Sequence, residues 1–324
     1  MRQKITILFP GQGQQFVGMG NDFSPELKKY LKDADSILGY DLSKICSEGP
    51  ADTLKLTANA QPAIIAYELA LFSKVQAILE NEGFVIERVL GHSVGEYAAL
   101  VAAGSLTFQD ALKLVHLRGK FMQEAVAVGV GSMVALLKVP VEVIEKGCQE
   151  VSTATEIVVP ANYNDPDQVV VSGHKAACDR LCQWLEAEGN VPAAIRYRAI
   201  PLEVSAPFHS PLMLSAADKL LPFLKESDLR PNIIPYIANI DATEYAAGTD
   251  ANTIRSNLYR QIAGSVRFEQ SVHSLPIYTN MIEVGPGKVL KGMVKKILPS
   301  GTTLSVSEEK ELAQLPEALR GLKI

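Results

Sequence analysis

A serine nucleophile is indicated by the segment Gly91-His92-Ser93-Val94-Gly95, which fits the pattern G-x-S-x-G. An apolar run ends directly before it and a helical pattern begins directly after it, and in that context the motif forms a sharp strand-to-helix turn. Such a turn exposes the serine hydroxyl beside a helix N-terminus, where backbone N–H groups can hold an oxyanion. The alternative is an ordinary turn in which Ser93 only caps the helix.

A serine hydroxyl needs a base that takes its proton, and histidine is the usual base. Of the five histidines, His209 fits best because it follows a strand that ends in Ser205-Ala206-Pro207-Phe208, where a tight loop can hold the imidazole. A solvated loop histidine is the alternative. We expect His92 to point away from the serine and to pack locally. Asp241, Glu283 or a backbone carbonyl could orient the base, and the residues do not choose among them.

An arginine interrupts the apolar face of the helix expected at Phe108–Val126. Arg118 follows Ala111 by seven residues and precedes Met122 by four, which places it on the inward face. An inward guanidinium needs a partner, because an unpaired buried charge is costly. That partner is either an internal carboxylate or the carboxylate of a ligand, for which the planar fork of arginine is suited. A side chain that reaches the surface is the third option.

Short apolar runs alternate with helical patterns in the first third of the chain. Strands are expected at Ile5–Phe9 and Val85–Leu90. Helices are expected at Pro25–Leu38, Pro62–Leu79 and Glu96–Ala103, and proline suits the first position of the first two. This alternation predicts an α/β fold with a mainly parallel sheet that is covered on both faces.

The middle of the chain has a different order of elements. They are a strand at Ser132–Val139, a helix at Val141–Val151, strands at Glu156–Ala161 and Gln168–Ser172, a helix at Lys175–Ala187 and a strand at Ala193–Ile200. This β-α-β-β-α-β order is typical of ferredoxin-like domains. We therefore expect a small domain inserted into the larger one, with boundaries near residues 130 and 202.

The last third returns to alternating elements. Strands are expected at Ile234–Ile240 and Met281–Val284, and helices at Pro211–Leu224 and Lys288–Ile297. The last of these helices carries Lys288, Lys291, Lys295 and Lys296 at spacings that can share one face. Such a face could meet an acidic partner protein, although a solvated helix face is the simpler interpretation.

Composition excludes several classes of function. The 324 residues are 47% hydrophobic and 21% charged, with a formal net charge of −5, so the chain lacks the basic excess of a nucleic-acid binder. No apolar run approaches the roughly 18–20 residues of a membrane-spanning helix, and no signal peptide is evident. Four cysteines, two of them Cys178 and Cys182, make neither a disulfide framework nor a zinc site, and we expect free thiols in a reducing compartment.

Several motifs together make the chain resemble the malonyl-CoA:acyl-carrier-protein transacylases, including the free-standing acyltransferases that serve polyketide synthases. The resemblance runs from about Ile5 to Ile297. Its motifs are Phe9-Pro10-Gly11-Gln12-Gly13, Ala60-Gln61-Pro62, Gly91-His92-Ser93-Val94-Gly95-Glu96, Arg118-Gly119, Gly131-Ser132-Met133, Ala161-Asn162-Tyr163-Asn164, Pro207-Phe208-His209-Ser210 and Glu283-Val284-Gly285-Pro286-Gly287.

The resemblance implies a role for each catalytic position. Ser93 is similar to the family's nucleophile and His209 to its general base. The backbone N–H groups of Gln12 and Val94 correspond to those of the oxyanion hole. The carbonyl of Gln261 resembles the group that orients the histidine.

The resemblance also implies the substrate-binding positions. Arg118 is similar to the residue that binds the malonyl carboxylate. Gln61 and Asn162 match residues that line the cleft, and Met122 is expected in the same site. Phe208 is typical of members that select malonyl, as is Val94. The departure at Gln14, where many members have serine, is expected to matter little.

What the family does is expected here as well: transfer of malonyl from malonyl-CoA to the phosphopantetheine thiol of an acyl carrier protein. No cofactor or metal is expected, and the chain is expected to be a cytoplasmic monomer that binds neither nucleic acid nor membrane. The implied fold is an α/β-hydrolase-like core, residues 1–129 and 203–324, with a ferredoxin-like insertion, residues 130–202.

Two other functions fit the same residues. A hydrolase would use the Ser93 and His209 site to release acyl groups to water, although it has little need of a carboxylate-binding arginine. A non-catalytic module that binds a carrier protein would have no reason to keep the serine, the histidine and Arg118 together.

Overall fold

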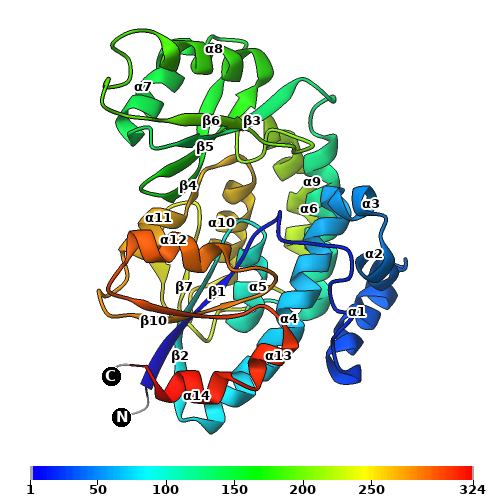
Figure 1. Cartoon of the computed structure of the whole chain (residues 1–324). Coiled ribbons are helices and arrows are strands. Elements are labelled where there is room, and N and C mark those ends of the chain that lie inside the picture. Colours follow the sequence, from blue (N-terminus) through cyan, green and yellow to red (C-terminus); the bar gives the residue numbers. More distant parts are fainter. Residues whose placement is uncertain (1–2, 323–324) are drawn as a thin grey trace.

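Two β-sheets form the framework of this protein, one above the other in Figure 1. The computed structural model describes residues 3–322. Within that range the strands are β1 (Gln3–Phe9), β2 (Phe84–Gly91), β3 (Gly131–Leu137), β4 (Val158–Asp165), β5 (Gln168–His174), β6 (Arg198–Pro201), β7 (Tyr236–Ile237), β8 (Glu244–Tyr245), β9 (Val266–Arg267), β10 (Asn280–Val284) and β11 (Thr302–Val306).

Helices surround both sheets. In the described residues they are α1 (Pro25–Leu38), α2 (Leu42–Glu48), α3 (Ala51–Lys55), α4 (Thr57–Asn81), α5 (Gly95–Ala102), α6 (Phe108–Glu124), α7 (Val141–Val151), α8 (Lys175–Glu186), the 3₁₀ turn Pro211–Met213, α9 (Leu214–Glu226), α10 (Ala251–Ala263), α11 (Phe268–His273), α12 (Val289–Ile297), α13 (Glu309–Leu312) and α14 (Leu315–Arg320). The strands and helices expected in the first third are all present.

The larger sheet is mainly parallel, as expected. Its order is β11-β10-β1-β2-β7-β8, and only the pairing of β7 with the edge strand β8 is antiparallel among its described strands. Ile7 and Phe9 pack on the α4 side of the sheet, whereas Leu8 packs on the side of α11 and α12. The strand therefore buries both faces, which explains its continuous apolar run.

The smaller sheet has the order β6-β3-β5-β4-β9 and lies at the top of Figure 1. The pairs β6–β3, β3–β5 and β5–β4 are antiparallel, and β9 joins β4 in parallel. Helices α7 and α8 cover one face, where Ile144, Leu181 and Val171 belong to a separate apolar core. The expected order of elements, β-α-β-β-α-β, is confirmed for residues 131–201.

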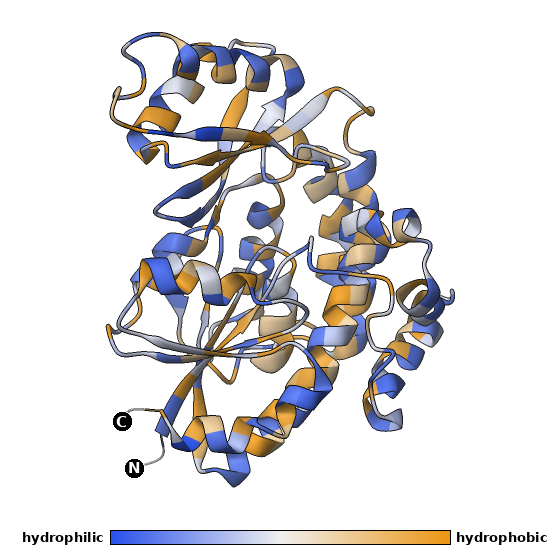
Figure 2. Ribbon diagram, in the orientation of Figure 1, coloured by the Kyte–Doolittle hydropathy of each residue, from blue (hydrophilic) through white to orange (hydrophobic). Residues whose placement is uncertain are grey.

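Helix α4 is the longest helix of the core. Figure 2 shows apolar residues along most of it, and its length and hydropathy would suffice to cross a membrane. That finding differs from our expectation that no apolar segment reaches this length. Of its most apolar window, 72% is buried inside the protein, so α4 packs as a core helix against α1, α5 and α6.

Several expected boundaries were wrong, including those of α4, β6 and β7. Helix α4 begins at Thr57, so Pro62 lies inside it, and the carbonyl of Ala58, which Pro62 cannot engage, accepts a hydrogen bond from His116 Nδ1 (2.9 Å). Strand β6 covers only Arg198–Pro201 and so contains three of the eight residues expected, since pairing with β3 begins at Arg198. Of the expected strand Ile234–Ile240, only Tyr236–Ile237 pairs with β2, because the chain then turns toward β8.

Candidate functional site

The turn after β2 holds Ser93 in a left-handed conformation, with φ of 52°. A Cβ atom on Gly91 would lie 2.0 Å from the carbonyl carbon of Gly95, and one on Gly95 would lie 2.3 Å from the carbonyl oxygen of Phe9. Both glycines are therefore required by close backbone packing. The turn places Ser93 at the start of α5, as the motif predicted.

Asn239, which follows β7, braces this turn from the neighbouring strand. Its side-chain Oδ1 accepts a hydrogen bond from Ser93 N (2.7 Å), and its Nδ2 donates to the carbonyl of Gly91 (2.6 Å). Asn239 is fully buried. Two hydrogen bonds from one rigid amide offset the strain of the positive φ. No signal in the sequence had pointed to this residue, 146 positions from the serine.

The histidine predicted as the base lies against the serine. His209 Nε2 is 2.7 Å from Ser93 Oγ, and its Nδ1 is 2.9 Å from the backbone carbonyl of Gln261. Since a carbonyl can only accept, Nδ1 carries the proton, and Nε2 is left to accept the serine proton. Neither Asp241 nor Glu283 orients the ring. Asp241 contacts Tyr245 and Arg260, and Glu283 accepts from the first N–H groups of α12.

His209 is buried and neutral. The pKa of His209 is lowered to about 3. Burial is the largest cause, and the nearby positive charge of Arg118 acts in the same direction. The Gln261 carbonyl acts in the opposite direction. The imidazole is thus held in its basic form throughout the neutral range, ready to accept a proton.

Arg118 points inward from α6, as its spacing predicted, and is 1% exposed. Its Nη2 donates to Ser93 Oγ (3.1 Å) and to the side-chain Oε1 of Gln261 (2.9 Å). Both acceptors are neutral, and no described carboxylate lies within ion-pair distance of the guanidinium. Nε has no hydrogen-bond partner in the described part of the chain. The Tyr97 ring lies 5.7 Å from the guanidinium carbon.

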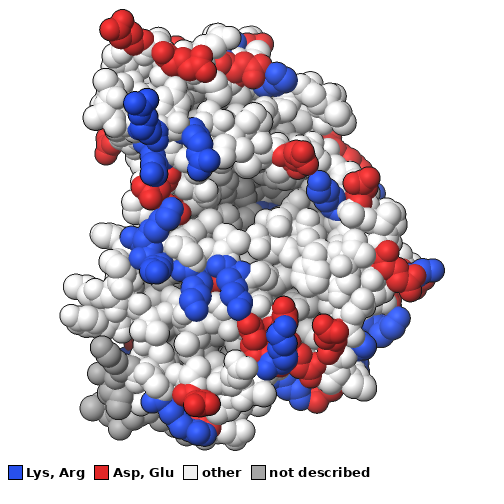
Figure 3. Space-filling view, viewed as in Figure 1, with Lys and Arg blue, Asp and Glu red and all other residues white. Residues whose placement is uncertain are grey.

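A cavity of about 640 Å³ opens above these three side chains. Figure 3 shows the corresponding hollow between the upper and lower parts of the molecule. Besides Ser93, His209 and Arg118, the residues predicted at the site that line it are Gln12, Gln61, Met122, Asn162 and Phe208. The backbone of Gln261 and the buried Val94 lie behind the wall rather than in it.

The backbone N–H groups predicted to hold an oxyanion are those of Gln12 and Val94. In residues 3–322 neither of them donates a hydrogen bond to another residue. The Gln12 side chain is fixed by its neighbours, because it accepts from Gln61 Nε2 and donates to Thr57 Oγ1, both at 3.4 Å. The two amides thus remain free for a ligand oxygen.

His92 points away from the serine, as expected, but its contact is not local. Its Nε2 lies 2.8 Å from Oδ1 of Asn164 on β4, and the Asn164 Nδ2 donates to Gln168 on β5. The nucleophile turn is thereby connected to the smaller sheet. Both sheets contribute walls to the cavity, since Asn162 and Val170 lie in the smaller one.

The lysines of α12 are not all available to a partner. Lys288 pairs with Glu311, and Lys296 pairs with Asp165, whereas Lys291 and Lys295 are exposed and form no ion pair with a described residue. Figure 3 shows blue side chains across this face, below the hollow. Elsewhere, no group of three or more potential metal ligands occurs among the described residues, and the four cysteines are free thiols.

Comparison with known proteins places this geometry in context. The family model described as acyl transferase domain matches residues 6–322. The malonyl CoA-acyl carrier protein transacylase of Bacillus subtilis is 39% identical over 322 residues, 98% of each chain. That of Escherichia coli K12 is 38% identical over 315 residues, 96% of this chain and 98% of the relative.

Solved structures agree. A type II polyketide synthase acyl-carrier protein in complex with its malonyl-transacylase contains a chain with a TM-score of 0.87 and 35% identity, covering 98% of this chain and 100% of that one. The malonyl CoA-acyl carrier protein transacylase of Coxiella burnetii has a TM-score of 0.88 and 34% identity, with 98% of each chain covered.

Proposed function

Since this chain belongs to the acyl transferase family and, within it, to the malonyl CoA-acyl carrier protein transacylases, we propose that it transfers a malonyl group from malonyl-CoA to the phosphopantetheine thiol of an acyl carrier protein. The acyl group is carried between the two thiols as an ester of Ser93. The observation that carries this proposal is the buried Arg118, which lies beside Ser93 without a carboxylate of its own.

The first half-reaction begins at Ser93. His209 Nε2 takes the hydroxyl proton while Oγ attacks the thioester carbon of malonyl-CoA. The N–H groups of Gln12 and Val94 hold the oxyanion of the tetrahedral intermediate, and each donor of this kind is worth roughly 3 kcal/mol in the transition state. The carbon–sulfur bond then breaks, and the proton passes from His209 to the departing CoA thiolate.

The second half-reaction runs in reverse with a new thiol. The phosphopantetheine thiol enters the emptied cavity and loses its proton to His209 as its sulfur attacks the malonyl ester. Collapse of the intermediate breaks the ester bond and returns the proton to Ser93 Oγ. One thioester replaces another at nearly equal free energy, so the residues need no cofactor to drive the exchange.

Arg118 selects the acyl group. A planar guanidinium binds a carboxylate through two parallel hydrogen bonds, and its N–H groups that lack a protein partner are suited to the free acid end of malonyl. Gln61, Asn162, Met122 and Phe208 line the cavity around this group, and we assign them to substrate binding.

The fold proposed for this site is an α/β-hydrolase-like core, residues 1–129 and 203–324, with a ferredoxin-like insertion at residues 130–202. The order β6-β3-β5-β4 of the smaller sheet and its separate apolar core support the division. Residues 1–2 and 323–324 of these ranges lie outside the described residues. Four free thiols support a reducing, cytoplasmic location, and the chain is proposed to act as a monomer.

Mass spectrometry of the intact protein after brief treatment with malonyl-CoA tests the scheme. We expect one malonyl adduct on Ser93, removed when carrier protein is added. Ser93→Ala is the matched control and should carry no adduct. Absence of the adduct during active turnover would contradict the scheme, and release of free malonate in place of malonyl-carrier would favour a hydrolase.

A further inference from the structure

Glu96 is a buried carboxyl group in the first turn of α5 that does not reach the cavity. It is 0% exposed, and it is absent from the cavity wall. Its Oε2 accepts hydrogen bonds from Gln261 Nε2 (2.8 Å) and from Asn239 N (3.0 Å), while Oε1 has no partner among the described residues. A buried carboxyl group with one unsatisfied oxygen is unfavourable for stability, so its presence calls for another explanation.

The side chain of Gln261 connects Glu96 to the charged group of the site. Its Oε1 accepts from Arg118 Nη2 (2.9 Å), and its Nε2 donates to Glu96 and to the carbonyl of Ser93 (2.9 Å). The two ends of an amide are not interchangeable here, because only the oxygen can accept from a guanidinium and only the NH₂ can donate to a carboxylate. Glu96 and the Ser93 carbonyl together therefore determine which way the amide points, and Glu96 is the charged acceptor of the two.

The same glutamine also orients the base, since its backbone carbonyl binds His209 Nδ1. The second contact of Glu96, Asn239, braces the Ser93 turn with its side chain. Glu96 thus reaches the nucleophile, the base and Arg118, in each case through one neutral residue.

The neutral amide of Gln261, which lies between Glu96 and Arg118, matters for selectivity. A carboxylate placed directly on Arg118 would neutralise it and occupy its N–H groups, and the site would then have no free cation for an acyl carboxylate. With the Gln261 amide between them, Glu96 and Arg118 form no ion pair, and Arg118 Nε stays without a partner.

We propose that Glu96 is a positioning residue for malonyl selectivity: together with the Ser93 carbonyl it orients the Gln261 amide so that a neutral oxygen holds Arg118 and leaves the remaining N–H groups to the substrate. This inference rests on the proposed malonyl transfer.

The test compares kcat/KM for malonyl-CoA with kcat/KM for acetyl-CoA in the full-length protein. In Glu96→Ala the amide keeps only the Ser93 carbonyl as an acceptor for Nε2 and is held less firmly. We expect the malonyl-to-acetyl ratio to fall by about tenfold or more, the effect of losing one hydrogen bond to a charged group. Glu96→Gln supplies an amide oxygen in place of Oε2 and should keep most of the ratio. An unchanged ratio in Glu96→Ala, with both rates reduced equally, would overturn the proposal.

Gln261→Glu provides a second test that conserves side-chain size and the backbone carbonyl. It places a carboxylate oxygen against Arg118 Nη2, and the malonyl-to-acetyl ratio should fall. Retention of the ratio in this variant would also overturn the proposal.

Glu68→Ala is the matched control, because Glu68 on α4 is equally buried and both of its oxygens lack partners among the described residues. It should leave the malonyl-to-acetyl ratio unchanged. A similar fall in Glu68→Ala would show that the effect of Glu96→Ala is a general loss of core packing. Malonylation of the wild-type protein is measured in parallel. If wild-type Ser93 is not malonylated, the proposed function fails; if it is, and Glu96→Ala keeps the ratio, only this inference fails.

Discussion

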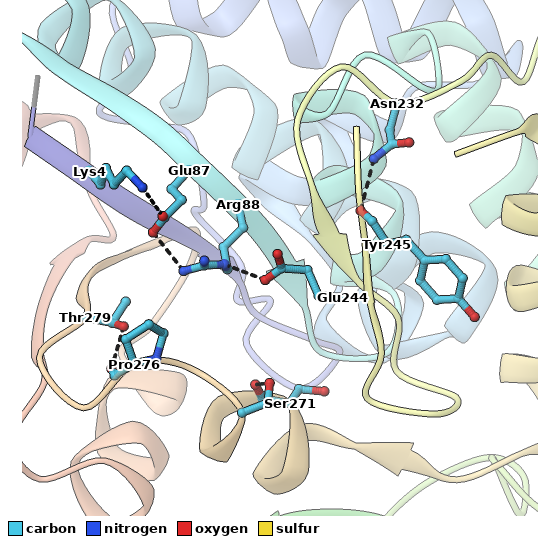
Figure 4. Close-up of polar contacts among 10 residues, drawn as sticks. Lys4, Glu87, Arg88, Asn232, Glu244, Tyr245, Ser271, Pro276 and Thr279 are labelled. Carbon is cyan, nitrogen blue, oxygen red and sulfur yellow. Dashed lines mark hydrogen bonds and ion pairs between the residues drawn. The ribbon is translucent and has the colours of Figure 1, made fainter. Parts of the chain in front are cut away.

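Two buried arginines in this protein differ in their hydrogen-bond acceptors, which are carboxylates for one and neutral oxygens for the other. Arg88 on β2 is 8% exposed, and it donates from Nε to Glu244 (2.7 Å) and from Nη1 to Glu87 (2.9 Å), as Figure 4 shows. Arg118 on α6 is more deeply buried, at 1% exposed, yet its acceptors are the neutral oxygens of Ser93 and Gln261.

The difference separates a structural cation from one kept for a ligand. Arg88 joins the strand β2 to the edge strand β8 and does not line the cavity beside Ser93, and two carboxylates neutralise its charge. Arg118 lines the cavity, and its charge acts on the site, since it contributes to the lowered pKa of His209. The comparison predicts that removal of Arg118 lowers malonyl transfer, whereas removal of Arg88 lowers the free energy of unfolding.

Arg118→Ala is expected to have the largest effect on activity. Hydrogen bonds to charged groups contribute roughly 1.5–3 kcal/mol each, so malonyl transfer should fall by about one to several orders of magnitude, while acetyl transfer is spared. Steady-state kinetics with both CoA thioesters checks this. Equal losses for the two acyl groups would remove Arg118 from the role of selector.

Arg88→Ala should show the opposite pattern. It leaves the Glu244 carboxylate without this ion-pair partner and Glu87 with Lys4 alone. Because both carboxylates are partly exposed, we expect a loss of about 1–3 kcal/mol in the free energy of unfolding, with unchanged malonyl transfer. Urea denaturation measures the loss. Lys4→Ala, which removes only an exposed pair with Glu87, is the control and should change stability little.

The pH dependence of acetyl transfer should distinguish the two arginines as well. Because the pKa of His209 is lowered to about 3, its protonation should not limit kcat/KM until the pH is far below the ordinary histidine pKa of 6.5. Arg118→Ala removes one cause of that lowering and should move the acid limb upward, whereas Arg88→Ala should not move it. An acid limb that stays in place in Arg118→Ala would contradict the assigned coupling.

The same pKa has a consequence for stability. The unfolded chain binds a proton on this histidine below pH 6.5, and the folded protein does not until about pH 3. Folding stability from His209 is therefore present above pH 6.5 and decreases as the pH falls toward 3. The pKa of Glu96 is raised by burial to about 7, so its contribution has the opposite sign and decreases as the pH rises through 7.

The smallest effect on activity is expected for changes to the exposed lysines of α12. Replacement of both Lys291 and Lys295 by Glu should raise the KM for an acidic carrier protein a few-fold, with the difference disappearing at high salt. Lys219→Glu on α9, an exposed lysine, is the control. Unchanged carrier kinetics would remove this face of α12 from carrier recognition.

Local patterns account for much of the site. The turn at Ser93 follows from its glycines, and the inward direction of Arg118 follows from helical spacing, because both depend on residues close in the chain. His209 could be selected by its loop. The assignment of Gln261, however, came from family resemblance, since a backbone carbonyl leaves no trace in residue type.

Other features depend on contacts between distant segments. Asn239 contacts Ser93 across 146 positions, and Glu96 contacts Gln261 across 165, so spacing carries no information about either pair. The start of β6 and the interruption after β7 depend on which neighbouring strand is available for pairing. The expected helix start at Pro62 was wrong for a similar reason, because a distant histidine supplies the hydrogen bond to the carbonyl that proline leaves free.

The central claim is that Arg118 is kept unpaired for the carboxylate of the acyl group, and a crystal structure of the malonyl-Ser93 form, prepared with malonyl-CoA in the absence of carrier protein, tests it most directly. We expect the malonyl carboxylate to accept two hydrogen bonds from the guanidinium at about 2.7–2.9 Å. A malonyl carboxylate directed toward solvent or toward another cation, with Arg118 still bound only to Gln261, would contradict the account.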